Sequence, residues 1–391
     1  GVTLTNNIVI NNASGLSGQG AIFAFGTSGS STLAGNITVN QTTVAGGLFA
    51  TAGATLNITG RITAAAGQIV SARIGKMVFS GSGSSADYFI NQQADVFLGA
   101  TDGLPTNAIL EMSTAGTSTF DLAGFNQTLR SLSRFNAGNA ATITNSNGAP
   151  SILTLNVLAA DGAGGGRNTG DYTYGGVITD NLAVVKNGAG TQTLSGANTY
   201  LGGTTVNLGT LKLGAANALG GNIGYNGALT VNGGKMDING VGNLAIGSLA
   251  GSGGVITDDG LQVGASVLST ATATSSLFAG SINDGAWRTL ALFKEGAGTL
   301  SLSGNSTYTG ITNVYAGVIN ARSATALGTS AGGTVVFTGA ALETQGGFTS
   351  AEPLTFGGTG TGAASGALRN IADANTLSGA ITVTSAARIN S

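Results

Sequence analysis

The sequence predicts an all-β fold: a single elongated right-handed parallel β-helix, or β-solenoid, built from super-repeats of roughly 110 residues. Three observations predict it. A long internal repeat indicates a stack of similar units. Short runs that alternate apolar and polar residues, separated by glycine-rich corners, are typical of strands with one buried face. The composition is rich in small residues for tight corners and in aliphatic residues for a thin core.

The composition separates this chain from ordinary globular proteins and from disordered ones. Of its 391 residues 68 are glycine and only 3 are proline, and charged residues make up 8%, against about 25% in a typical globular domain. Hydrophobic residues still reach 42%, which is too many for a disordered chain. The net charge of −2 argues against nucleic acid as a partner, since phosphate binding needs a basic face.

The first hundred residues carry the least regular version of the strand pattern. Val2–Thr5, Asn7–Ile10 and Asn36–Val39 alternate apolar residues with Thr or Asn, and clusters of Gly, Asn and Ser separate them. Each run is expected to form a short strand. Residues 1–109 are therefore predicted to form irregular β-helix coils, with capping as a candidate role.

The central repeat begins at Lys186. Lys186–Gly220 returns as Lys294–Gly328 without a gap, and about half of the aligned positions are identical, which indicates stacked copies of one unit. Together with its flanking motifs, the repeat divides the remaining chain into three predicted parts. These are super-repeat 1 (110–220), super-repeat 2 (221–328) and a partial super-repeat 3 (329–391), which we interpret as truncated or as a docking end.

Three short runs in the first copy have the length expected for the faces of a β-helix. They are Gln192–Leu194, Thr204–Val206 and Thr210–Leu213. Each is expected to pair in parallel with its equivalent one coil away, about 4.8 Å along the axis, in the right-handed sense of parallel crossovers. The side chains expected to point inward are Leu194, Val206, Leu211 and Leu213.

Two kinds of segment depart from the strand pattern. Ala215–Leu219 and its equivalent Ser323–Leu327 carry at most one turn of helical pattern, and a corner between strands is the preferred interpretation. Asp161–Gly170 is dominated by glycine and is predicted to bulge from the stack as a loop.

The repeat also resembles a known family. The pattern K-x-G-A-G-T-x-x-L-S-G-x-x-T-Y at Lys186–Tyr200 and Lys294–Tyr308 is similar to the passenger-associated repeat of bacterial autotransporters. The resemblance implies a right-handed parallel β-helix secreted across the outer membrane of a diderm bacterium, with an outer-membrane translocator elsewhere in the full-length chain. The second copy departs from the family pattern, since Ile311 and Asn313 replace the usual Gly and Thr.

The residues available for catalysis are few, and neither a cofactor nor a metal site is predicted. With no His and no Cys, nucleophilic triads and the usual zinc sites are excluded. The adjacent acids Asp258 and Asp259 invite a glycosidase or calcium interpretation, but neighbours on a strand point to opposite faces, so a polar corner is preferred. Asp180 and Asp284 hold equivalent repeat positions, which favours a turn-stabilising role over catalysis.

Three aromatic residues are candidates for ligand binding or self-contact. Tyr200 and Tyr308 occupy equivalent positions in the two copies, where they either stack inside the solenoid or line an outer face as a sugar-stacking platform. The single tryptophan, Trp287, lies in a short insertion (Ala286–Thr289) relative to the first super-repeat and is expected to project as a loop. Packing in the core or at an edge remains the alternative for all three.

These observations favour a non-enzymatic, extracellular β-helical protein at the cell surface of a diderm bacterium. It is expected to act as a stalk or adhesin, with multivalent polar contacts to glycans or to neighbouring copies of the same protein. The first alternative is a self-assembling structural fibre or filament subunit joined laterally or end to end. The second is a polysaccharide-active enzyme, which needs a carboxylate cluster that the sequence does not offer.

Overall fold

The fold is known from a computed structural model, which describes residues 1–11, 22–24, 28–40, 47–51, 53–112, 116–134, 140–160, 169–222, 225–361 and 365–391. Within these ranges the structure consists of strands and turns, without a helix. Nearly all strand pairs are parallel and join successive coils, so the predicted all-β solenoid is confirmed. Most of the predicted loop over Asp161–Gly170 lies outside the described residues. The chain divides into two compact units, Gly1–Gly202 and Gly203–Ser391.

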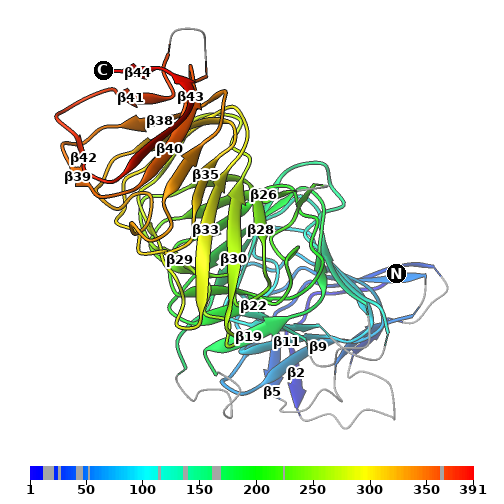
Figure 1. The fold of residues 1–391 in the computed structure, drawn as a ribbon. Helices are drawn as coiled ribbons and strands as arrows, with labels where there is room; N and C mark the ends of the chain where they lie inside the picture. The colour runs from blue at the N-terminus through cyan, green and yellow to red at the C-terminus, as the bar shows by residue number, and fades with distance from the viewer. Residues whose placement is uncertain are drawn as a thin grey trace. The chain divides into compact units, whose positions relative to one another are not determined.

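Unit 1 stacks its coils into several parallel sheets (Figure 1). The largest sheet has the strand order β1 (Thr3–Leu4), β4 (Gly29–Leu33), β7 (Ala54–Ile58), β10 (Gly75–Phe79), β12 (Ala94–Leu98), β14 (Ser118–Asp121), β17 (Ala141–Thr144) and β20 (Val177–Ile178). A second sheet has the order β16 (Ser131–Arg134), β13 (Ile109–Met112), β11 (Tyr88–Asn91), β9 (Ile69–Ala72), β6 (Leu48–Ala50) and β3 (Ile22–Ala24). The remaining ladders are β2 (Ile8–Asn11), β5 (Ile37–Asn40) and β8 (Ile62–Ala64); β15 (Gln127–Leu129), β18 (Ser151–Asn156) and β21 (Leu182–Asn187); and β19 (Asp171–Tyr174) with β22 (Thr191–Leu194).

Unit 2 repeats the same architecture. Its longest ladder, labelled in part in Figure 1, has the order β23 (Thr204–Val206), β26 (Tyr225–Val231), β28 (Leu244–Ala250), β30 (Gly264–Thr270), β33 (Arg288–Lys294), β35 (Thr312–Val314), β37 (Thr334–Val336), β40 (Leu354–Gly358) and β43 (Ile381–Ala387), and β25 (Gly221–Asn222) pairs antiparallel with β26. A second ladder contains β24 (Thr210–Leu213), β27 (Lys235–Asp237), β29 (Val255–Thr257) and β32 (Ser281–Ile282). A third contains β31 (Ser276–Phe278), β34 (Thr299–Leu302), β36 (Gly317–Ala321), β38 (Ala340–Thr344), β41 (Leu368–Asn370) and β44 (Ile389–Asn390), and β39 (Thr349–Ser350) pairs with β42 (Thr376–Leu377).

The cores of both units are columns of side chains at equal register. In the largest sheet of unit 1, for example, Met77 pairs with Leu56 and with Val96, and all three are buried. The side chains predicted to point inward, Leu194, Val206, Leu211 and Leu213, are fully buried. Alternate residues face outward, so each strand presents one column to the core and one to the surface.

The corners follow from glycine and from close backbone approach. A Cβ on Gly196 would lie 1.8 Å from the carbonyl oxygen of Gly176 in the preceding coil, so no other residue fits without moving the backbone. The segments Ala215–Leu219 and Ser323–Leu327 form turns, as the corner interpretation predicts. The Ala218 backbone N–H donates to the Ala215 carbonyl at 3.2 Å, and the equivalent bond joins Ala326 to Ser323.

Candidate functional site

The two repeat tyrosines lie inside the solenoid, so they do not form a surface platform. Tyr200 and Tyr308 are both fully buried. The Tyr308 hydroxyl lies 2.6 Å from Thr312 Oγ1, which itself donates to the Leu327 carbonyl at 3.2 Å. Burial raises the pKa of Tyr308 far above its ordinary value. Of the two alternatives, internal packing therefore describes both residues, because neither ring is accessible to a ligand.

Trp287, by contrast, is exposed, with 59% of its surface accessible. It directly precedes β33, and the Gly264 backbone N–H at the start of β30 donates to its carbonyl at 3.2 Å. Because Gly264 pairs with Arg288, Val263 lies across from Trp287 on the neighbouring coil. Val263 and Leu261 are each 82% exposed. The three residues form an exposed apolar corner, and the proposed role of Trp287 in ligand or self-contact stays a prediction.

A buried ion pair on the interior side of this corner holds it in place. Arg288 Nε donates to Asp258 Oδ2 at 2.7 Å, and the Asp258 side chain is fully buried. The guanidinium also donates to the carbonyls of Gln262 and Ala265 at 3.1 and 3.2 Å, and to Ser266 Oγ at 3.0 Å. Arg288 therefore ties the segment that carries Leu261 and Val263 to the strand that follows Trp287.

Glycines make room for the arginine. A Cβ on Gly264 would lie 2.5 Å from Arg288 Nη1, and a Cβ on Gly260 would lie 2.8 Å from Arg288 Cδ. A side chain at position 264 would require the arginine to move, and one at position 260 would also meet the Gly240 backbone N at 2.6 Å. The small residues of this corner therefore leave space for the Arg288 side chain. The sequence shows this feature only as scattered glycines.

The Asp258 carboxylate is held in its charged form. Burial alone would raise its pKa, but hydrogen bonds from Ser266, Arg288 and the backbone N–H groups of Gly240 and Gly260 outweigh burial and hold the pKa below its usual value. Ser266 Oγ donates to Oδ2 at 2.6 Å, and Gly240 N donates to Oδ1 at 2.5 Å. A carboxylate satisfied in this way has no free oxygen aimed at a substrate.

The neighbouring acid, Asp259, has a different environment. It is half exposed and pairs with Lys235, with Nζ and Oδ2 2.7 Å apart. Asp258 and Asp259 thus bind different partners, Arg288 and Lys235, as the polar-corner interpretation predicts. No group of three or more acidic side chains suited to a metal ion occurs in the described part of the chain.

The repeat-equivalent acids Asp180 and Asp284 brace corners. Asp180 has a φ of 70° and accepts hydrogen bonds from the hydroxyls of Thr144 and Thr179. Asp284 Oδ1 accepts from the Leu290 backbone N–H at 2.7 Å, while Oδ2 accepts from Thr309 Oγ1 at 2.6 Å. These contacts are the turn-stabilising role that the sequence favoured.

A polar row runs along the outer face of unit 1. Its residues occupy one register position on successive strands of the largest sheet and are at least partly exposed: Ser30, Thr55, Lys76, Asp95, Thr119 and Thr142. A parallel row on the same face includes Phe97, and Lys76 Nζ lies 4.4 Å from the centre of its ring. We call the first set the polar row. The sequence shows these residues only as isolated polar positions, because the register that aligns them is not visible in it.

The outer face of unit 2 has the opposite character. On β28, β30, β33, β35 and β37 the two charged residues, Arg288 and Lys294, turn inward. Thr289, Ser269 and Asn313 occupy outward positions on these strands. The other outward positions, on or directly before these strands, carry mostly apolar side chains that are partly or largely exposed: Val263, Trp287, Val267, Ala291, Phe293, Ile311 and Val335. We call this set the apolar face.

Aromatic rings extend the apolar face across further coils. Phe293 and Tyr315 meet edge to face, with centroids 5.4 Å apart, and Tyr315 stacks on Phe337 at 4.6 Å. Tyr315 and Phe337 are each 40% exposed. No pattern in the sequence marks these three residues. They are well separated in sequence, and the first repeat copy has Val185 and Asn207 at the positions of Phe293 and Tyr315.

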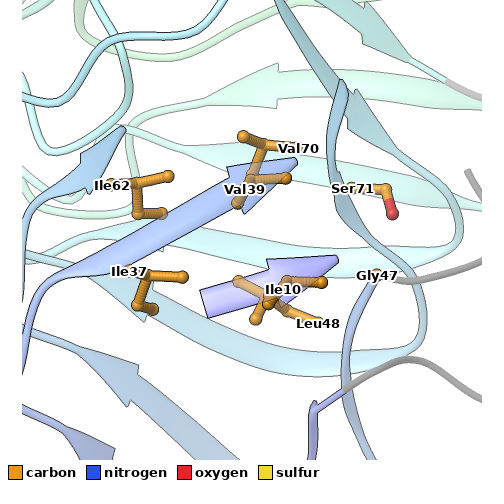
Figure 2. Close-up of a pocket in the computed structure, with 8 residues that line it drawn as sticks. All are labelled: Ile10, Ile37, Val39, Gly47, Leu48, Ile62, Val70 and Ser71. Atoms are coloured by element: carbon orange, nitrogen blue, oxygen red, sulfur yellow. The ribbon is translucent and has the colours of Figure 1, made fainter. Parts of the chain in front are cut away.

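A core hollow and a surface hollow in the described part of unit 1 differ in character. Figure 2 shows the first, which lies among buried aliphatic side chains of β2, β5, β8, β6 and β9, including Ile10, Ile37 and Val70. Its volume of about 10 Å³ is no more than one water molecule needs, so it is a packing defect of the core. The second is a surface hollow of about 390 Å³ on the polar row, where Thr55, Lys76 and Asp95 line it beside Ile74.

Comparison with known proteins identifies the repeat. The family model described as the passenger-associated-transport-repeat matches residues 184–213 and 292–321. The chain carries two passenger-associated transport repeats. On a β-solenoid they are consistent with an autotransporter passenger domain, as the resemblance of the sequence implied. No curated protein and no solved structure shows a significant match.

Each passenger-associated repeat contains a buried lysine that the sequence analysis passed over. Lys186 Nζ donates to the carbonyls of Asn187 and Gly188 at 2.9 and 2.8 Å. Lys294 Nζ donates to those of Glu295 and Gly296, both at 2.7 Å. Gly188 and Gly296 have φ values of 73° and 74°, so the ammonium group closes a left-handed corner. The signal was the K-x-G spacing shared by both copies.

Burial depresses the pKa of both repeat lysines to about 8. The buried carboxyl of Glu352 also lies in unit 2, where Thr334 Oγ1 donates to Glu352 Oε1 at 2.8 Å. Burial raises the pKa of this carboxyl to about 7.

In the described residues, no helix is both long and apolar enough to cross a membrane.

Proposed function

We propose that the chain is the exported, surface-exposed part of an autotransporter-like protein of a diderm bacterium, and that it acts as an adhesin or stalk. It binds glycans through many weak polar contacts and carries out no catalysis. The two passenger-associated repeats on a β-solenoid support export to the surface. The polar row on the outer face of unit 1 supports glycans as the proposed partner.

The polar row is the observation that carries the proposal. Hydroxyl groups of Thr55, Thr119 and Thr142 and the charged groups of Lys76 and Asp95 lie at one register position, and strands in such a sheet are about 4.8 Å apart. Such a spacing presents a line of hydrogen-bond donors and acceptors to an extended, hydroxyl-rich ligand. Each contact is weak alone, and avidity arises when many form in register.

The surface hollow gives this row a point where a sugar ring fits. Its volume of about 390 Å³ falls within the range of small-ligand sites. Lys76 and Asp95 offer a donor and an acceptor at its wall, and the Phe97 ring lies beside Lys76. An uncharged or zwitterionic saccharide suits this combination better than a polyanion, because the two charges cancel.

The proposal is tested with the whole chain on an array of immobilised glycans. We expect binding to survive added salt better than phosphate binding would, and to fall at least tenfold in the double variant Asp95→Ala, Thr119→Val. Asp171→Ala, which removes an exposed acid on β19 of the same unit, is the matched control and should bind as the native chain does. Unchanged array binding by the double variant would count against the polar row, and release of soluble sugars would contradict a non-enzymatic role.

A further inference from the structure

The apolar face of unit 2 is unusual for the surface of a protein that otherwise exposes small polar residues. Its centre lies on β30 and β33, where Val267 pairs with Ala291 at outward positions. Phe293 follows on the same strand, and Val335 lies two strands further along the ladder. Ser269 and Asn313 interrupt the patch on either side of Phe293, but it stays mainly apolar, and a large apolar patch on a sheet face is typical of an interaction surface.

No outward position on the strands of the patch carries a charged side chain, and the half-buried Glu295 borders it just beyond β33. Its two basic neighbours, Arg288 and Lys294, both turn toward the interior. Arg288 is neutralised by the buried Asp258, and Lys294 Nζ is enclosed by the carbonyls of Glu295, Gly296 and Ala316. The centres of two identical copies of this face would therefore meet without charge repulsion, and a two-fold contact needs such a self-complementary patch.

The patch is also held rigid. At one end, the Arg288–Asp258 pair and the glycine cradle fix the corner that carries Trp287 and Val263. At the other end, Tyr315 stacks on Phe337 and accepts a hydrogen bond from Asn313 Nδ2 at 3.1 Å. Rigid aromatic and arginine-supported surfaces lose little conformational entropy when they bind, and they are the usual centres of protein interfaces.

We propose that the apolar face is a contact surface for a second copy of this chain, with the same face of both copies meeting in a lateral, two-fold contact. Sheets that pack face to face lie about 10 Å apart and need apolar inner faces, which this face supplies. The contact goes beyond glycan binding and does not depend on it.

The size of the face sets the strength of the contact. Five strands about 4.8 Å apart, each contributing about five residues with a rise of about 3.3 Å, cover on the order of 400 Å². Stable complexes bury about 800 Å² per partner. Two free chains are therefore expected to associate weakly, whereas many chains on one surface are expected to hold two surfaces together by avidity.

The test uses the full chain coupled to beads through a C-terminal tag, in buffer without glycan. Native beads should clump, and the free chain should show a weak, concentration-dependent rise in sedimentation coefficient. Ala291→Lys and Val335→Lys are made as separate variants. Because the contact is two-fold, either substitution places a lysine on both copies, and each should slow clumping at least tenfold. Val9→Lys, a change of an exposed valine on β2 of unit 1, outside both the polar row and the apolar face, is the matched control and should clump as native beads do.

Thermal unfolding of each variant verifies that the solenoid is intact. Dispersed native beads, or equal clumping of native, Ala291→Lys and Val335→Lys beads, would overturn the proposal. So would native chain that binds phosphatidylcholine vesicles through this face and fails to clump, since the occupant would then be a lipid surface. Glycan-array binding of the same variants is read separately, so a failure of self-contact is distinguishable from a failure of glycan binding.

Discussion

Replacing Arg288 by methionine tests how the corner beneath Trp287 is stabilised. The substitution keeps an unbranched apolar stem in the glycine cradle and removes the guanidinium. Asp258 then stays buried, with hydrogen bonds from Ser266 and from the backbone N–H groups of Gly240 and Gly260 but no counter-ion. Breaking a buried ion pair in this way costs about 3–5 kcal/mol. The remaining donors place the expected loss at about 3 kcal/mol, near the lower end of that range.

The assay is amide hydrogen exchange followed by mass spectrometry, since solenoid coils open locally as well as globally. A loss of about 3 kcal/mol corresponds to exchange more than about 100-fold faster in β30 and β33. Lys235→Met is the control, because it removes the half-exposed partner of Asp259 and is expected to change stability by less than about 1 kcal/mol. Equal effects of the two substitutions would refute the assignment of Arg288 as the anchor.

The pH dependence gives a second readout of the same pair. The pKa of Asp258 is lowered in the folded chain, so the contribution of the pair is present above the unfolded-state pKa and is lost as pH falls through the lower folded value. In Arg288→Met, protonation of Asp258 instead relieves an unpaired buried charge. The difference between variant and native chain should therefore shrink as pH is lowered toward 4, and a constant difference would contradict this account.

Three further predictions concern buried groups. Because the pKa of Glu352 is raised to about 7, native stability should fall as pH rises from about 4.5 through 7. Glu352→Gln should therefore raise the urea midpoint at pH 8 but not at pH 4. An equal shift at both pH values would exclude titration of Glu352 as the cause. Lys294→Met should lower stability at pH 7 by about 1–3 kcal/mol because it leaves corner carbonyls unpaired. Since the pKa of Lys294 in the folded chain is about 8, native stability should rise between pH 8 and 10.5. Urea titration should find this rise reduced in the variant. Tyr308→Phe should lower stability by about 1 kcal/mol in the same assay, because Thr312 keeps its bond to the Leu327 carbonyl, and a loss above about 3 kcal/mol would indicate a larger polar network.

The sequence determined the fold class because the information for it is local and repeated. Alternation along each run fixes which side chains turn inward, so the burial of Leu194 and Leu211 could be predicted from neighbours alone. Glycine at fixed offsets fixes the corners, and the K-x-G-A-G-T pattern was enough to indicate the passenger-associated repeat. The corner interpretation of Ala215–Leu219 succeeded for the same reason.

Only the tertiary structure decided which surfaces are available, because the relevant residues meet through register between coils. Tyr308 and Trp287 were equal candidates in the sequence, yet one is buried and the other exposed. Asp258 and Arg288 are far apart along the chain, and only the stacking of β30 and β33 brings them to 2.7 Å. The number of residues in each coil varies, so a sequence pattern cannot align outward positions; the hydrogen-bonded ladder aligns them and thereby creates the polar row and the apolar face.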